Sequence, residues 1–135
     1  MTGAAAKPAP IRDVWNGPFL DACKDRRLLL QCCLETKKFF YPPAPVSPYT
    51  GKRAWEWREA SGQGSLWSFV VFHQNYFAGF ADEIPYAVVM VELDEGPFLL
   101  TNLRGATASD LTIGQRVKVV FDEGETSLPH FAPET

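Results

Sequence analysis

Cysteine is scarce in this sequence, and its placement excludes a disulfide framework. Only 3 cysteines occur in 135 residues, and two of them, Cys32 and Cys33, are adjacent. Small disulfide-stabilised domains carry even sets of well-spaced cysteines in an oxidising compartment. The thiols are therefore expected to be reduced, as in a cytoplasmic protein.

The sequence also lacks an excess of positive charge and a long apolar run. With 13 Lys and Arg against 16 Asp and Glu, the net charge is −3, which argues against neutralising a phosphate backbone. No apolar run approaches the roughly 18 residues of a membrane helix. The start, MTGAAAKPAPIRD, has no apolar segment typical of a secretory signal. We expect neither a nucleic acid nor a membrane as a partner.

Two apolar runs around a turn form the most informative stretch that is present. They are Tyr86–Leu93 and Phe98–Leu103, joined by the turn DEGP. Valines suit strands and Gly96 accepts a positive φ, so the pattern predicts a β-hairpin. Pro97 has no N–H to donate, which places the second strand at a sheet edge or a bulge. Both runs are apolar at nearly every position, which is typical of strands covered on both faces.

Further short apolar segments predict a mainly β protein. The expected strands are Arg27–Cys33, Phe39–Tyr41, Trp55–Ala60, Ser65–His73, Gln115–Phe121 and Leu128–Phe131. Turn residues separate these segments, and one helical turn is expected within Thr107–Ile113. Short strands at this spacing, without a long helix between them, predict a sandwich or a small closed barrel.

The N-terminal part is expected to contain a short helix. Met1–Ile11 is rich in small residues and proline and is expected to be disordered or to lie over a partner. Within Asp13–Lys24, either Asn16 or Gly17 is a suitable start for a helix with Pro18 in its first turn.

Two groups of aromatic residues are candidate contacts for a partner. Trp15 and Phe19 are four residues apart and form one apolar patch, which either seals the core or faces an interface. Tyr76, Phe77 and Phe80 lie among Gly and Ala in the connection 74–85, outside any predicted strand. Loops often carry function, although these rings also suit a lid on the protein's own core. The sequence leaves both alternatives open for each group.

One segment has the spacing of a zinc site without its ligands. Cys33 and Thr36 are separated by two residues, as are Ser47 and Thr50, with prolines before the second pair. Four cysteines at these positions would predict a tetrahedral zinc site. Hydroxyls are poor zinc ligands and both histidines are distant in sequence, so Cys33 alone is a candidate ligand. We expect no structural zinc and no other cofactor.

Taken together, several segments resemble a known family. In order, they are PFLDACKDRRLLLQCC (18–33), YPPAPVSPYTG (41–51), WEWREASGQGSLWSFVVFH (55–73), PYAVVMVELDEGPFLLTNLRG (85–105), LTIGQRVKVVFDE (111–123) and LPHFAP (128–133). They resemble the acyl-CoA-associated family once catalogued as domain-of-unknown-function family thirty-five, which has a rubredoxin-like zinc ribbon followed by an OB-fold. The sequence departs from this family at positions 36, 47 and 50, where the family usually has cysteine.

The resemblance implies both a fold and a partner. The implied fold is an N-terminal tail and helix (1–26), a degenerate zinc ribbon (27–54) and an OB-fold barrel (55–135). Members of this family are similar to non-catalytic small subunits, or fused domains, that stabilise thiolase-superfamily enzymes and help shape an acyl-CoA channel. The implied assembly is a heterotetramer with a thiolase or retro-aldolase that acts on acyl-CoA, including steroid side-chain intermediates. The two aromatic groups are then the expected contacts with the partner or the channel.

The remaining candidate groups are a basic pair and scattered titratable residues. Lys52 and Arg53 are placed to meet a CoA phosphate, although such pairs are usually solvated surface. Cys33, His73 and His130 form no nucleophile–base constellation by their spacing. The alternative functions are a single-stranded nucleic-acid-binding OB-fold, which normally needs a basic groove, and a free-standing acyl-CoA-binding protein.

Overall fold

Two antiparallel sheets and one α-helix make up most of the regular structure in the part of the chain that the computed structural model describes. The described residues are 11–73, 86–104, 108–121 and 128–134. The elements are α1 (Gly17–Lys24), β1 (Leu29–Cys33), β2 (Phe39–Phe40), β3 (Trp55–Glu59), β4 (Gln63–Phe72), β5 (Tyr86–Leu93), β6 (Phe98–Asn102), the 3-10 turn η2 (Ala108–Asp110), β7 (Arg116–Phe121) and β8 (Pro129–Pro133). The mainly β fold predicted from the sequence is confirmed. Among the described residues, no helix is long and apolar enough to cross a membrane.

The short helix begins where the sequence predicted. Asn16 is its N-cap residue and Pro18 lies in its first turn, where a missing N–H costs nothing. Just before it, the Asp13 carboxylate accepts hydrogen bonds from the backbone N–H groups of Trp15 and Asn16, at 2.8 and 2.7 Å. Phe19 and Cys23, four residues apart, are buried in the hydrophobic core. The helix is therefore attached to the rest of the protein by its apolar face.

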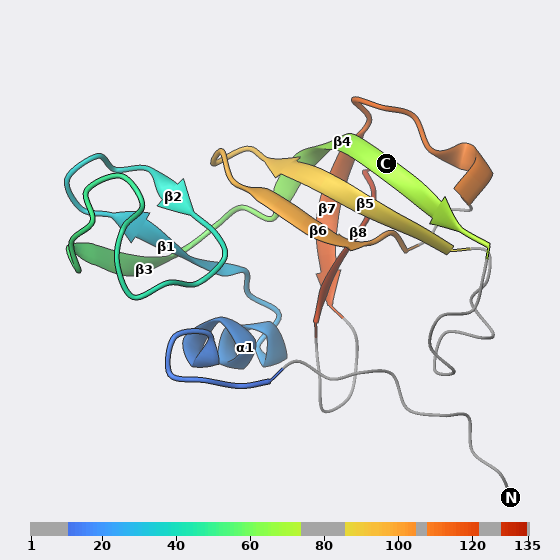
Figure 1. The fold of residues 1–135 in the computed structure, drawn as a ribbon. Coiled ribbons are helices and arrows are strands. Elements are labelled where there is room, and N and C mark those ends of the chain that lie inside the picture. The colour runs from blue at the N-terminus through green and yellow to red at the C-terminus, as the bar shows by residue number, and fades with distance from the viewer. Residues whose placement is uncertain (1–10, 74–85, 105–107, 122–127, 135) are drawn as a thin grey trace, which may run out of the picture.

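The smaller sheet has the strand order β2-β1-β3. Its central strand is almost entirely buried, and it pairs with β3 from Leu29 opposite Glu59 to Cys33 opposite Trp55. The expected boundary at residue 55 placed the segment of β3 in the barrel. The structure instead pairs β3 with β1, so the division between the sheets follows Glu59. Figure 1 shows this sheet to one side of the larger sheet, with α1 near the junction.

The larger sheet has the order β6-β5-β4-β7-β8 and closes on itself. Closure joins β6 to β8: Leu103 forms a parallel bridge with Phe131, and the Arg104 N–H donates to the Phe131 carbonyl at 2.7 Å. The Thr101 hydroxyl adds a 2.7 Å hydrogen bond to the Pro129 carbonyl. A closed sheet of this size matches the predicted OB-type barrel.

The predicted hairpin joins β5 and β6. Gly96 has a φ of 116°, and its N–H donates to the Leu93 carbonyl at 2.8 Å. Pro97, which has no N–H to donate, lies just outside the β5–β6 pairing, which begins at Phe98 opposite Glu92.

One hydrophobic core extends through both sheets and the helix. Its buried members are Phe19, Cys23, Leu28, Leu30, Ala60, Leu66, Ala87, Val89, Val91, Leu93, Leu99, Val117 and Phe131. Residues from α1 and β1 therefore share a core with the barrel, and the two sheets support each other.

The entry to β4 depends on a glycine that approaches β7 closely. Gly62 has a φ of 79°, and a Cβ at this position would overlap the Cγ1 atom of Val119. The Val119 N–H donates to the Gly62 carbonyl at 2.7 Å, which holds the two backbones together. The position therefore excludes a side chain for both conformational and steric reasons.

We expect Gly62→Ala to lower the free energy of unfolding by about 2–4 kcal/mol, the sum of backbone strain and overpacking. Urea denaturation measures this change. Gly51→Ala is the matched control, because Gly51 has a φ of 72° but nothing within 4 Å of its Cβ position. The control should lose only the strain, about 1 kcal/mol. Equal losses in the two variants would contradict the steric argument.

Candidate functional site

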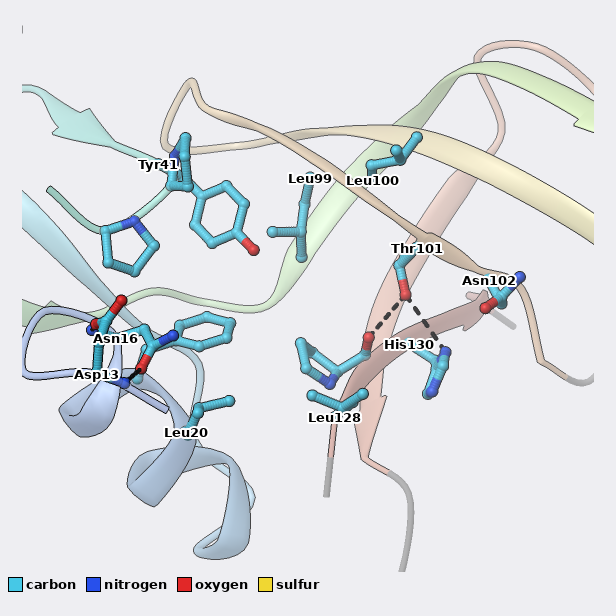
Figure 2. A pocket seen from close by; sticks show the side chains of 14 residues that line it. Asp13, Asn16, Leu20, Tyr41, Leu99, Leu100, Thr101, Asn102, Leu128 and His130 are labelled. Carbon is cyan, nitrogen blue, oxygen red and sulfur yellow. Dashed lines mark hydrogen bonds between the residues drawn. The ribbon is translucent and has the colours of Figure 1, made fainter. Parts of the chain in front are cut away.

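A cavity of about 420 Å³ lies between α1, the Tyr41–Pro43 segment and strands β6 and β8. Its volume falls within the ~300–1,000 Å³ range of small-molecule sites. The lining is mostly apolar, with Phe19, Leu20, Tyr41, Pro42, Pro43, Leu99, Leu100, Leu128 and Pro129. The polar lining residues are Asp13, Asn16, Thr101, Asn102 and His130. Figure 2 shows the helix side and Tyr41 facing Thr101, Leu128 and His130 across the cavity.

One wall of the cavity is built on an aromatic pair. The rings of Phe19 and Tyr41 are tilted against each other with their centroids 5.6 Å apart. Burial raises the pKa of the Tyr41 phenol above its usual value, with a smaller contribution from Cys23. The phenol therefore stays neutral and able to donate a hydrogen bond near the apolar part of the cavity.

The opposite wall carries a hydrogen-bonded chain that ends in a buried histidine. Arg104 Nη2 lies 3.3 Å from His130 Nε2, and a guanidinium can only donate, so Nε2 accepts. The ring proton then belongs on Nδ1, which donates to Thr101 Oγ1 at 3.3 Å. The Thr101 hydroxyl in turn donates a hydrogen bond to the Pro129 carbonyl. This chain fixes the orientation and tautomer of the ring.

These contacts leave the cavity with the chemistry of a binding site. The Thr101 hydroxyl lies beside His130 and already donates a hydrogen bond to the Pro129 carbonyl. Asp13 Oδ1 is engaged at the start of the helix. Among the described residues, no nucleophile and base face the cavity together in the arrangement that covalent catalysis needs. An apolar lining with a few fixed polar groups instead suits binding of an elongated, largely apolar group.

The predicted N-terminal aromatics and the basic pair already have contacts within the chain. Phe19 is 5% exposed and belongs to the core, as in the core-sealing alternative. Trp15 is half-buried, with the Arg53 guanidinium 5.4 Å from its ring centre. Lys52 forms an exposed ion pair with Glu35 at 3.2 Å. Both cations are exposed, and their predicted contact with a CoA phosphate stays a prediction.

The loop aromatics Tyr76, Phe77 and Phe80 lie outside the described residues. Their predicted contact with a partner stays a prediction. Tyr41 and Thr101 lie in segments that carry the family resemblance, but the sequence analysis assigned neither of them a role in a site. His130 was noted without a role, and only the fold brings it to the same cavity as Tyr41.

The segment with zinc-like spacing forms two equivalent turns. The Lys37 N–H donates to the Cys33 carbonyl at 2.9 Å, and the Gly51 N–H donates to the Ser47 carbonyl at 2.8 Å. Lys37 and Gly51 have positive φ angles of 62° and 72°. The two turns therefore repeat the same backbone geometry without a shared set of metal ligands.

Side chains from both turns converge on one thiol. Hydrogen bonds from the Ser47 and Thr36 hydroxyls lower the pKa of Cys33 to about 7, and both Cys33 and Ser47 are fully buried. No group of three or more His, Cys, Asp and Glu side chains that could hold a metal occurs among the described residues. One sulfur with hydroxyl neighbours does not fit the thiolate and imidazole set that zinc requires.

The metal hypothesis can be tested on the same turns. We expect a chelator to leave the Tm of the native protein unchanged, because its donor set does not fit zinc. The variant Thr36→Cys/Ser47→Cys/Thr50→Cys should retain about one zinc per chain after dialysis, since four thiolates form a complete site. Elemental analysis measures the metal, and Thr36→Cys alone is the control. Stoichiometric zinc in the native chain would overturn the expectation.

The Cys33 thiol should titrate separately from the buried Cys23 thiol. We expect a thiolate absorbance transition near pH 7 that Cys33→Ser abolishes and Cys23→Ala retains, because burial raises the pKa of Cys23 to about 11. Between about pH 7 and the ordinary thiol pKa of 9.0, the unfolded state binds more protons, so stability should rise with pH. This gain should be lost as the pH falls through 7. A transition unaffected by Cys33→Ser would contradict the assignment.

The fold and the cavity define a class of protein. It is a small closed β-barrel with an appended three-stranded sheet, and its binding cavity lies between the barrel and α1. The model of the ChsH2 C-terminal OB-fold domain matches residues 57–122. A solved chain of the "Ltp2-ChsH2(DUF35) aldolase" is 36% identical, with a TM-score of 0.83 over 93% of this chain and 98% of that chain. The chain described here belongs to the DUF35 family.

Two curated relatives are similar over almost the whole chain. The "Probable enoyl-CoA hydratase alpha subunit" of Thermomonospora curvata is 37% identical over 96% of this chain and 40% of its own length. The "3-oxo-4,17-pregnadiene-20-carboxyl-CoA hydratase alpha subunit" of Mycobacterium tuberculosis is 30% identical over 97% of this chain and 41% of its own length. The chain therefore spans about two-fifths of the length of these relatives.

Proposed function

We propose that this chain is a non-catalytic accessory subunit of a thiolase-superfamily enzyme, a thiolase or retro-aldolase, that acts on acyl-CoA thioesters. The observation that carries the proposal is the near-complete match to the DUF35 chain of a two-protein aldolase, with 36% identity over 98% of that chain. A match of this extent covers the helix, both sheets and the cavity together.

The names of the curated relatives support CoA thioesters as the substrate class. Both relatives are called subunits of CoA hydratases, and one name specifies a steroid carboxyl-CoA. Since this chain corresponds to only part of each relative, the hydratase activity itself is not transferred. We infer a CoA thioester, including a steroid side-chain thioester, as the substrate of the assembly.

The cavity gives this subunit a role beside the substrate. Its apolar wall of Phe19, Tyr41 and Leu99 suits an acyl or pantetheine chain, and the fixed Thr101 and His130 offer polar contacts at its other wall. Within the described residues, the cavity has no catalytic constellation, so the reacting groups belong to the larger subunit. In this proposal the small subunit stabilises its partner in a heterotetramer and helps shape the acyl-CoA channel.

A free-standing acyl-CoA-binding protein is a second candidate, and the cavity is the observation that favours it. Binding of a CoA thioester by the isolated chain would support this alternative. A requirement for the partner would support the subunit hypothesis.

The experiment is to express the chain with and without a thiolase-superfamily chain chosen from the genes that neighbour its own in the host, called the neighbouring chain below. We expect one complex with a mass of two copies of each chain, and CoA-thioester turnover that needs both chains. Light scattering measures the mass, and liquid chromatography of CoA products measures turnover. The control is the cavity variant Leu20→Ser, which should keep the complex while lowering kcat/KM. Full activity of the neighbouring chain alone, or no complex, would refute the proposal.

A further inference from the structure

Part of the outer surface of the barrel is apolar. Alternate residues of β4, β5 and β6 face away from the core, where the register sets Val70 opposite Val88 and sets Met90 opposite Leu100. Trp67, Val70 and Leu100 are 56%, 55% and 63% exposed, and Phe98 is also exposed. We call Trp67, Val70, Met90, Phe98 and Leu100 the outer apolar face. An antiparallel sheet face left in water is normally polar, so this face is suited to being covered.

A β-bulge places the largest member of this face. Leu66 pairs with Val91 and Ser68 pairs with Met90, so Trp67 is the extra residue between them. Its ring packs edge-on against Phe98 of β6, with the centroids 5.1 Å apart. The two exposed rings therefore hold each other in place across the face. A fixed aromatic pair loses little conformational freedom when a partner binds.

The face continues into a groove. A hollow of about 630 Å³ lies between the β5–β6 hairpin and the β2 region, and Phe98 lines it together with Phe39, Tyr49 and Pro97. The Tyr49 hydroxyl donates to the Phe39 carbonyl at 3.1 Å, and the Lys38 ammonium lies 5.4 Å from the Tyr49 ring centre. The groove wall is thus pre-formed, and Phe98 joins the groove to the outer apolar face.

We propose that the outer apolar face and this groove form the docking surface for the catalytic subunit, which would cover the face and insert an apolar side chain into the groove. This inference rests on the proposed function and adds which surface of the chain contacts the catalytic subunit. The occupant is a protein, because the chain matched over 98% of its length is one component of a two-protein aldolase. Exposed Trp, Tyr and Phe beside a hollow are the composition of interface hot spots.

The exposed aromatic residues suit the centre of such an interface. A stable complex buries about 800 Å² on each partner, and aromatic side chains are enriched where that surface is most apolar. Trp67, Phe98 and Tyr49 are 56%, 41% and 47% exposed, so a partner that covers them buries further apolar area.

The test compares two single variants in the full chain. Val70→Lys places a charge on the face, and Ile113→Lys places one at an equally exposed apolar position in the connector before β7; the two residues are 55% and 58% exposed. Affinity for the purified neighbouring chain is measured by titration calorimetry. We expect Val70→Lys to weaken binding at least thirtyfold and Ile113→Lys to change it less than threefold. Circular dichroism and Tm verify that each variant is folded, and Trp67→Ser replaces Val70→Lys if that variant unfolds.

The outcomes separate this inference from the proposed function. If the native chain does not bind the neighbouring chain, both are wrong. If the native chain binds, and Val70→Lys and Trp67→Ser bind as tightly as the native chain, the docking surface is wrong and the proposed function stands. If the isolated native chain dimerises, and Val70→Lys abolishes the dimer without changing the affinity for the neighbouring chain, the face joins two copies of this chain and the proposal is overturned.

Discussion

Closure of the barrel between β6 and β8 is the constraint on which the candidate site depends. The bridge from Leu103 to Phe131 and the hydrogen bond from Thr101 to the Pro129 carbonyl join strands that are distant in sequence. The same contact brings Thr101 beside His130 and opens the cavity towards α1. Without closure, β6 would be an unpaired edge and the polar wall of the cavity would not exist.

The two turns beside the smaller sheet keep the same backbone geometry although their side chains do not form a set of metal ligands. Backbone hydrogen bonds close both turns, and the hydroxyls of Thr36 and Thr50 also accept the N–H groups two residues further on, at 3.3 and 3.2 Å. A buried central strand attaches these turns to the common core. Backbone and hydroxyl hydrogen bonds, together with the common core, therefore hold the two turns in place.

The doubly apolar strands connect the core to the proposed assembly. In β5, Val89 and Val91 are fully buried, whereas Met90 faces outward opposite Leu100. The inward set stabilises the barrel, and the outward set contributes little to the isolated fold. A partner that covers the outward set gives these residues a physical role, in agreement with a subunit whose chemistry depends on another chain.

The sequence alone determined the local elements. Asn16 and Pro18 predicted the helix start, Gly96 and Pro97 predicted the hairpin, and the apolar runs predicted the strands, because each depends on neighbouring residues. The tertiary structure decided which sheet receives β3, the burial of Phe19, the outward position of Trp67, and the meeting of Tyr41 with His130. These features depend on contacts between distant segments, such as the 28-residue separation of Thr101 and Pro129, and on a register that a single bulge changes. The pattern of apolar residues in a sequence indicates which side chains are expected to be buried. Only the packed chain determines which other residues bury them.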